Sequence, residues 1–127
     1  MIEPIRVSIV DAIECMVAVL GSDGPPILLC STVDDDGFVG PGNAFSLENG
    51  WPSAEVLLEL PRRIGATAML FGSRATRSVF DPDDRDTTLF AYLEETTEAA
   101  GIFLVEHVLI RENTFRLMRE ASRPNDV

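Results

Sequence analysis

The sequence predicts one mixed α/β (α+β) domain in which two main helices pack on a sheet. Short apolar runs bounded by turn residues predict the strands, and two segments with apolar residues at helical spacing lie between them. The chain has 127 residues, a length that suits a single hydrophobic core. We therefore expect a single domain over residues 1–127, with a lead-in at about 1–12 and a frayed tail at about 121–127.

The first part of the chain predicts strands joined by turns. The apolar run at 14–20 ends at a glycine and is typical of a buried strand. Residues 22–26 have turn composition, so Ile27–Val33 is expected to form the second strand of a hairpin. The acidic residues 34–36 precede a glycine and predict a solvated turn, because they lack the alternate spacing of a calcium loop. Residues 38–47 contain glycines and predict a strand with a bulge.

The first helix is expected between Pro52 and Pro61. Proline suits the first turn of a helix, and Ser53 or Asn49 can cap it. Pro61 is expected to end the helix, because proline forces the preceding residue out of the helical region. Apolar and acidic side chains fall on separate faces of this segment.

The second part of the chain predicts a strand, a polar loop, a helix and a final hairpin. Residues 66–71 are expected to be the most buried strand, and 72–80 the loop after it. A helix at about 84–100 follows; Asp83 and Asp86 have the spacing of a capping arrangement and Gly101 suits its C-terminal end. Strands are expected at 102–111 and 115–118.

Composition excludes several kinds of site. All ten basic residues are arginine, so no lysine nucleophile exists, and His107 is the single histidine. Cys15 and Cys30 lie in apolar runs and are expected to be buried free thiols. The net charge of −11 disfavours nucleic-acid binding, which draws its affinity from phosphate neutralisation. No apolar run suggests a membrane helix or a signal peptide, so we expect a cytoplasmic protein without membrane contact.

Several segments resemble the RadC-type JAB/MPN domains. The segment VGPGNAFSLENGWPSAEV at 39–56 is similar to that family's Gly-x-x-Asn-Ala…Pro-x-x-Glu-Val segment. The run GIFLVEH at 101–107 is similar to its Gly-Ile-x-Leu-Leu-Asp-His strand, with Glu106 in place of aspartate. The resemblance implies a JAB/MPN-like mixed sheet with cytidine-deaminase-like layering. It does not extend to the helix-hairpin-helix segment that RadC proteins often carry.

The same resemblance implies a metal site that this chain has lost. The related JAMM metalloproteases carry a glutamate, then His-x-His, seven residues, a serine, two residues and an aspartate. Glu14 falls at the glutamate and Asp86 at the aspartate, whereas Ser73 and Ala75 replace the histidines and Asp83 replaces the serine. Zinc needs those imidazole nitrogens, so we expect no zinc cofactor and no catalytic residue.

The side chains of this segment also have simpler interpretations. Asp86 is either a former ligand or a helix-capping residue, and His107 is expected to be a hydrogen-bonded core residue. Three arginines, Arg74, Arg77 and Arg85, are contacts for an anion or partners of the acids at 81, 83, 84 and 86; ion pairing is the preferred interpretation.

The sequence thus predicts a catalytically inactive RadC-like JAB/MPN domain that acts as a binding, scaffold or regulatory module. Its expected partner is another protein or a second copy of the chain, and Trp51 and Phe45 are candidates for that surface or for the core. One alternative is a hydrolase with remodelled ligands, which come from a second chain or hold a different ion at Glu14, Asp83 and Asp86. Another is the DNA-repair association of RadC, which the acidic charge disfavours.

Overall fold

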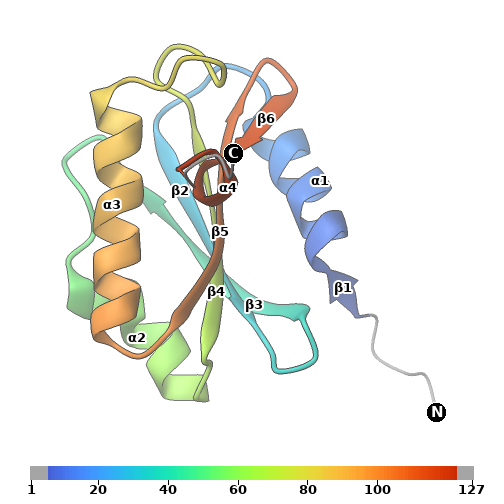
Figure 1. Cartoon of the computed structure of the whole chain (residues 1–127), viewed down its shortest axis with the longest axis vertical. Helices are drawn as coiled ribbons and strands as arrows, with labels where there is room; N and C mark the ends of the chain where they lie inside the picture. Colours follow the sequence, from blue (N-terminus) through green and yellow to red (C-terminus); the bar gives the residue numbers. More distant parts are fainter. Residues whose placement is uncertain (1–5, 123–127) are drawn as a thin grey trace, which may run out of the picture.

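The computed structural model describes residues 6–122, and these form a six-stranded mixed sheet with helices on both faces (Figure 1). The strand order across the sheet is β1-β3-β2-β4-β5-β6; β4 and β5 are parallel and every other neighbouring pair is antiparallel. The expectation of a mixed α/β fold is confirmed at this level. The elements are β1 Val7–Ser8, α1 Ile9–Leu20, β2 Ile27–Val33, β3 Phe38–Ser46, α2 Ala54–Ile64, β4 Ala68–Arg74, α3 Asp84–Ala99, β5 Phe103–Arg111, β6 Thr114–Leu117 and α4 Met118–Ser122.

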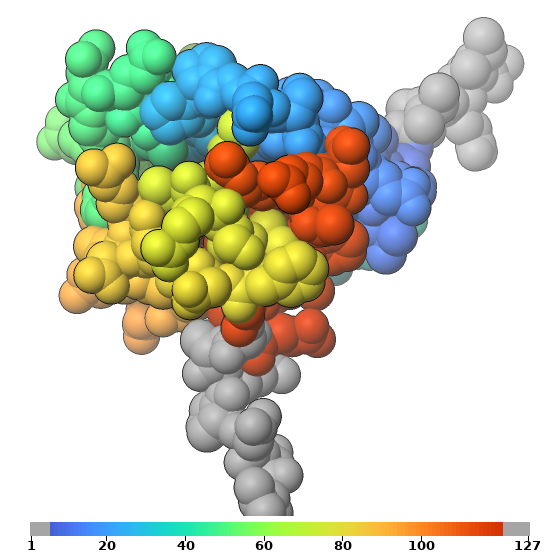
Figure 2. Space-filling model, turned by 90° about the horizontal axis from the view of Figure 1, so that it is seen from above, coloured from blue at the N-terminus to red at the C-terminus, as the bar shows by residue number. Residues whose placement is uncertain are grey.

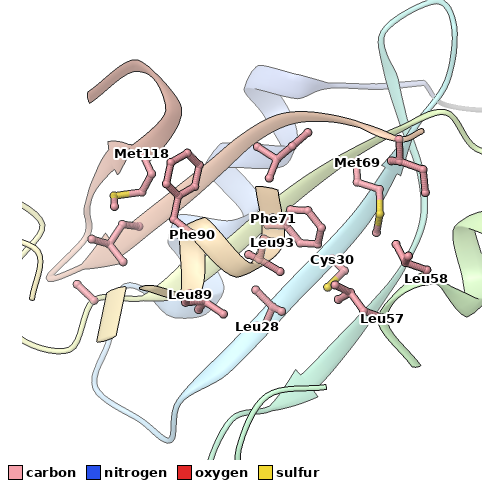
Figure 3. Close-up of a cluster of buried hydrophobic side chains, with 14 of the residues drawn as sticks. Leu28, Cys30, Leu57, Leu58, Met69, Phe71, Leu89, Phe90, Leu93 and Met118 are labelled. Carbon is pink, nitrogen blue, oxygen red and sulfur yellow. The ribbon is translucent and has the colours of Figure 1, made fainter. Parts of the chain in front are cut away.

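The core has two parts, one on each face of the sheet. Alternate residues of β4 point to opposite faces, as they must in a strand, so Phe71 packs under α2 and α3 while Leu70 packs against α1. Figure 3 shows the larger part, in which Leu57 and Leu58 of α2 and Leu89, Phe90 and Leu93 of α3 meet the sheet. β4 is buried from both sides, which agrees with its nearly continuous apolar sequence.

Helix α1 replaces the strand expected at 14–20. Ser8 caps it by accepting a hydrogen bond from the Asp11 amide at 3.1 Å, and Ala12, Met16 and Leu20 make its buried stripe. A short apolar run bounded by breakers fits a buried strand or a buried helix equally well, so periodicity alone misassigned it. The helix also takes up residues 9–12 of the expected lead-in.

The hairpin partner of β2 is therefore β3, not the segment before it. The acidic turn forms as expected: one Asp34 carboxylate oxygen accepts from the amides of Asp36 and Phe38 at 2.9 Å each. The pairing shifts between Ser31 and Val33, where β3 has one extra residue, and this confirms the predicted bulge. Gly42 allows the backbones to approach closely, because a Cβ there would collide with the Cys30 carbonyl oxygen.

Helix α2 begins at the predicted cap Ser53, with Pro52 before the helix and not in its first turn, and it ends later than predicted. Ser53 is its N-cap, with its hydroxyl accepting from the Val56 amide at 3.3 Å. Pro61 lies inside the helix, which continues to Ile64 and stops at Gly65 in the left-handed conformation. The helix accommodates Pro61 because the missing proline amide removes only one hydrogen bond, close to the helix end. The helix ends at Gly65, since glycine readily adopts the left-handed conformation.

The second half of the chain follows the prediction closely. Asp83 and Asp86 form the expected capping box of α3, and Gly101, with a φ of 71°, follows its end. Strand β4 extends to Arg74, so the loop after it is shorter than expected. Helix α4 was not predicted; the tail expected at about 121–127 overlaps its end, and residues 123–127 lie outside the described residues.

The structure also bears on the expectations for the cysteines and for membrane helices. Cys30 is buried as expected, but Cys15 is exposed on α1, because the helix turns it away from the sheet. None of the helices between residues 6 and 122 has the length and apolar character needed to cross a bilayer.

Gly21 fixes the C-terminal end of α1 against the β5–β6 turn. A Cβ at Gly21 would collide with Asn113 Oδ1 and the Val17 carbonyl oxygen, and the Asn113 amide donates to the Gly21 carbonyl at 3.2 Å. We predict that Gly21→Ala lowers the free energy of unfolding by about 1–3 kcal/mol through overpacking. The exposed neighbour gives a control, Ser22→Ala, which should stay within about 0.5 kcal/mol. Urea denaturation measures both; equal stabilities would contradict the prediction.

Candidate functional site

A cavity of about 320 Å³ lies where the parallel strands β4 and β5 end. Figure 2 looks onto this face, where the α1–β2 connection, the β3–α2 connection, the β4–α3 loop and the β5–β6 turn come together. Ligand sites of α/β proteins often lie at the carboxyl ends of parallel strands. The cavity is lined by Asp23, Gly24, Pro26, Leu47, Trp51, Arg74, Ala75, Thr76, Arg85, Asp86, Leu89 and Arg111.

Asp86 ties the start of α3 to the loop after β4. Its carboxylate accepts from the Thr76 amide at 3.2 Å and from the Thr76 hydroxyl at 2.9 Å. The Asp83 amide completes the set at 3.4 Å, and the Asp83 carboxylate in return accepts from the amides of Arg85 and Asp86 at 3.0 and 3.2 Å. Both acids therefore act as acceptors for backbone amides, which is the capping interpretation of Asp86.

The electrostatics of Asp86 follow from its position. Burial raises the pKa of its carboxyl above the ordinary value, and the two hydrogen bonds from Thr76 oppose that shift. Thr76 thus stabilises the ionised form of a carboxylate that is otherwise poorly solvated.

Ser73 and His107 form a polar pair inside the core beneath α3. The Ser73 hydroxyl and His107 Nε2 are 2.7 Å apart, and both residues are almost completely buried. The Phe90 ring of α3 lies 5.9 Å from the imidazole, while Nδ1 is buried without a hydrogen-bond partner. His107 is thus the core residue that was expected, satisfied at one nitrogen. Neither side chain lines the cavity, so the pair does not present a nucleophile to a substrate.

Zinc of the JAMM type does not fit these residues. Ala75 lines the cavity beside Asp86 but carries no donor atom, and the Ser73 hydroxyl is engaged with His107. Glu14 lies on the exposed side of α1 and does not line the cavity, because α1 is a helix where a strand was expected. The remodelled set of Glu14, Asp83 and Asp86 is therefore not brought together. Within residues 6–122, no three His, Cys, Asp or Glu side chains are arranged to hold a metal ion.

The three loop arginines have three different environments. Arg77 pairs with Asp81 at 3.0 Å, as the ion-pair interpretation expected. Arg74 instead donates to backbone carbonyls of the α1–β2 region: Ser22 at 2.9 Å, Pro25 at 2.6 Å and Val19 at 3.4 Å. Arg85 makes no side-chain ion pair or hydrogen bond with the described residues. Ion pairing with the nearby acids is thus wrong for Arg74 and Arg85, because Asp83 and Asp86 are occupied by backbone amides.

Sequence reasoning missed three residues of this cavity: Thr76, Trp51 as a lining residue, and Arg111. Trp51 is 40% exposed and its ring stacks on Tyr92 with centroids 5.3 Å apart, whereas Phe45 packs against the core. Arg111 ends β5, and its Nη1 donates to the carbonyls of Ala75 at 3.1 Å and Thr76 at 3.4 Å. The signal that was available is positional, since Arg74 and Arg111 end two strands that become parallel neighbours.

Comparison with known proteins gives no match: no family model and no curated protein is similar to this chain. The family suggested by the sequence segments therefore stays a prediction.

The buried histidine makes stability depend on pH. Burial lowers the pKa of His107 from 6.5 to about 3. The unfolded chain takes up a proton on this histidine near pH 6.5, and the folded chain takes it up only near pH 3. The contribution of neutral His107 to stability is therefore full above pH 6.5 and is lost as the pH falls from 6.5 towards 3. We predict that, by about pH 4, the wild type loses about 3 kcal/mol more stability than His107→Phe does. Urea midpoints across this range measure it.

Two buried carboxyls act in the opposite direction, so the comparison must be between variants. Burial raises the pKa of Asp86 and Glu106, and stability from their protonated forms is lost as the pH rises through those raised values. Phe90→Leu is the matched control, since it alters the ring beside His107 but removes no titrating group. It should lower stability at every pH and keep the slope. A pH dependence that is the same in His107→Phe as in the wild type would contradict the assignment.

Proposed function

We propose that this protein is a non-catalytic RadC-like JAB/MPN domain that works as a binding module. The supporting sequence segments lie at 39–56 and 101–107, and the mixed sheet with α2 and α3 on one face is compatible with that family's layering. The observation that carries the proposal is the use of Asp83 and Asp86. These two acids, which the resemblance aligns with metal-site residues, cap a helix and hold a loop.

Metal analysis tests the non-catalytic part of the proposal. We predict that the full chain, purified without chelator and dialysed against zinc, retains clearly less than one zinc per chain, because Ala75 and Ser73 offer no ligands. The same measurement with manganese tests the alternative of an all-oxygen site. A stoichiometric ion in either case, together with peptide hydrolysis, would overturn the proposal.

The face that suits a protein partner lies between α1 and the β2–β3 hairpin. A groove of about 420 Å³ runs there, lined mainly by apolar atoms; Val19 and Cys15 lie on the helix side and Leu29 and Ala44 on the sheet side. Val10 and Val19 of α1 are 66% and 58% exposed. Exposed apolar surface of this kind marks an interaction site.

Strand β3 gives this face a free edge. β1 pairs only with Phe38 and Val39, so the rest of β3 has β2 on one side and no strand on the other among the described residues. Residues 38–46 contain no charged side chain, although charges are a common protection of an edge strand. Pro41 and the bulge beside it interrupt this edge in its middle, so residues 42–46 form its regular uncharged part. Two uncharged edges can pair antiparallel about a two-fold axis, so we assign this face to a second copy of the chain.

Solution mass tests this assignment. We predict that the wild-type chain is a dimer by light scattering and that Ala44→Lys, which places a charge in the groove, shifts it to monomer. Val56→Lys is the matched control, because Val56 is 48% exposed on α2 and does not line the groove. A monomeric wild type, or equal loss of the dimer in both variants, would contradict the assignment.

A further inference from the structure

Three guanidinium groups line the cavity at the ends of β4 and β5, although the chain carries a net charge of −11. Arg74 and Arg85 have no carboxylate partner among residues 6–122. Arg111 pairs only with Asp23, at 3.8 Å, and the Asp23 side chain is 91% exposed. An ion pair so exposed contributes little and is readily exchanged. The lining also contains two carboxylates, Asp23 and Asp86, so three arginines minus two acids give the cavity a formal charge of +1 on a chain of net charge −11.

The second carboxylate of the cavity, Asp86, makes its close contacts with other groups than the three guanidinium groups. Asp86 directs its oxygen atoms to the amide and hydroxyl of Thr76 and to the amide of Asp83. It forms no ion pair with Arg74, Arg85 or Arg111 in the described residues. A guanidinium without a carboxylate partner in such a cleft attracts an external anion.

Two of the guanidinium groups are held in place before any ligand arrives. Arg74 uses three of its five N–H donors on backbone carbonyls, which fixes the plane of the group and leaves two donors. Arg111 is fixed by the carbonyls of Ala75 and Thr76, and its Nε is buried without a partner. Groups held in this way lose little side-chain entropy on binding.

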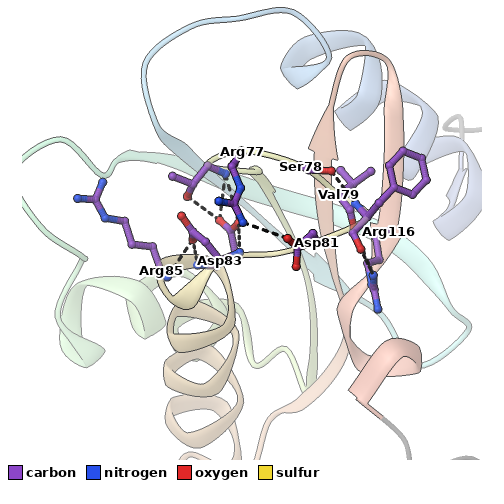
Figure 4. Close-up of polar contacts among 10 residues, drawn as sticks. Arg77, Ser78, Val79, Asp81, Asp83, Arg85 and Arg116 are labelled. Atoms are coloured by element: carbon purple, nitrogen blue, oxygen red, sulfur yellow. Dashed lines mark hydrogen bonds and ion pairs between the residues drawn. The ribbon is translucent and has the colours of Figure 1, made fainter.

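Arg85 is the adjustable member of the three. It lies on the first turn of α3, and Figure 4 shows its side chain extending away from Asp81 and Asp83. Its guanidinium makes no hydrogen bond or ion pair with residues 6–122, so its removal should leave the fold intact.

The rest of the cavity is apolar and partly flat. Leu47 and Leu89 line it together with Trp51, whose ring is steadied by the stacked Tyr92. The Tyr92 hydroxyl donates to the Pro52 carbonyl at 2.7 Å, which fixes the stack beside the cavity. A volume of about 320 Å³ equals that of roughly ten water molecules, so the matching ligand has about that number of non-hydrogen atoms.

We propose that this cavity binds a small organic anion in which a carboxylate or phosphate is attached to a flat apolar group. The anion lies among Arg74, Arg85 and Arg111, and the flat group packs against Trp51 and the leucines. This site shares no lining residue with the groove between α1 and β3, so it is independent of the proposed self-association.

The single tryptophan of the chain makes the site directly observable. The Trp51 indole signal in NMR spectra of the full-length protein is followed during titration with benzoate, phenyl phosphate, acetate, inorganic phosphate and benzylamine. We expect saturable shifts with benzoate or phenyl phosphate, weaker shifts with the anions that lack a ring, and none with benzylamine. Which of the two ring anions binds more tightly separates a carboxylate ligand from a phosphate ligand.

Arg85→Gln and Arg77→Gln form a matched pair, because each removes one exposed positive charge near the same loop. Arg77 pairs with Asp81 and does not line the cavity. Arg85→Gln should raise the Kd of the tighter-binding ring anion by about tenfold, because it removes a charge-assisted contact. Arg77→Gln should change this Kd by less than about twofold.

If the two variants weakened binding equally, the binding would be explained by general charge attraction, and the proposed site would be wrong. Absence of saturable Trp51 shifts with both ring anions would overturn it as well. Benzylamine binding as tightly as benzoate would overturn the charge assignment. Solution mass in the same samples reports separately on the self-association of β3, so the two proposals can fail independently.

Discussion

The hydrogen bonds between Asp86 and Thr76 are the interaction on which the functional face depends. They join the first turn of α3 to the residues that follow β4, and the Asp83 capping box holds Asp86 in place within the helix start. Because these bonds fix the helix start against the strand end, they also fix the two walls of the cavity. Arg74 and Ala75 stand on one wall, and Arg85 and Leu89 stand on the other.

The same bonds decide how charge is distributed. An acidic chain is expected to neutralise its few arginines, but Asp83 and Asp86 satisfy backbone amides that are otherwise unpaired at a helix start. Within residues 6–122, the neighbouring guanidinium group of Arg74 is held by carbonyl oxygens and that of Arg85 has no acidic partner. The demand for capping thus leaves guanidinium groups without close carboxylate partners in a cavity of this negatively charged protein.

The sequence predicted what is encoded locally and failed where tertiary packing decides. The capping box at Asp83 and Asp86, strand β2 and the acidic turn at 34–37 all carry short-range signals that formed as expected. Helix α1 did not, because a seven-residue apolar run is ambiguous until a sheet covers one side of it. Of the cavity, Arg74, Arg85 and Asp86 were predictable as neighbours in one loop. Trp51 comes from the β3–α2 connection and Arg111 from the end of β5, and no local sequence pattern predicts that they join this cavity.

The pair of Ser73 and His107 has a consequence for the alignment of the two central strands. The Ser73 hydroxyl and His107 Nε2 are hydrogen-bonded to each other in the middle of an apolar layer. A shift of one residue in the register of β4 and β5 would separate the two side chains and leave both polar groups buried without a hydrogen-bond partner. Each such group would lower the free energy of unfolding by about 1–3 kcal/mol. Substitution of one partner alone carries the same penalty, whereas simultaneous replacement by a well-fitting apolar pair does not. Among relatives of this chain, these two positions should therefore vary in concert.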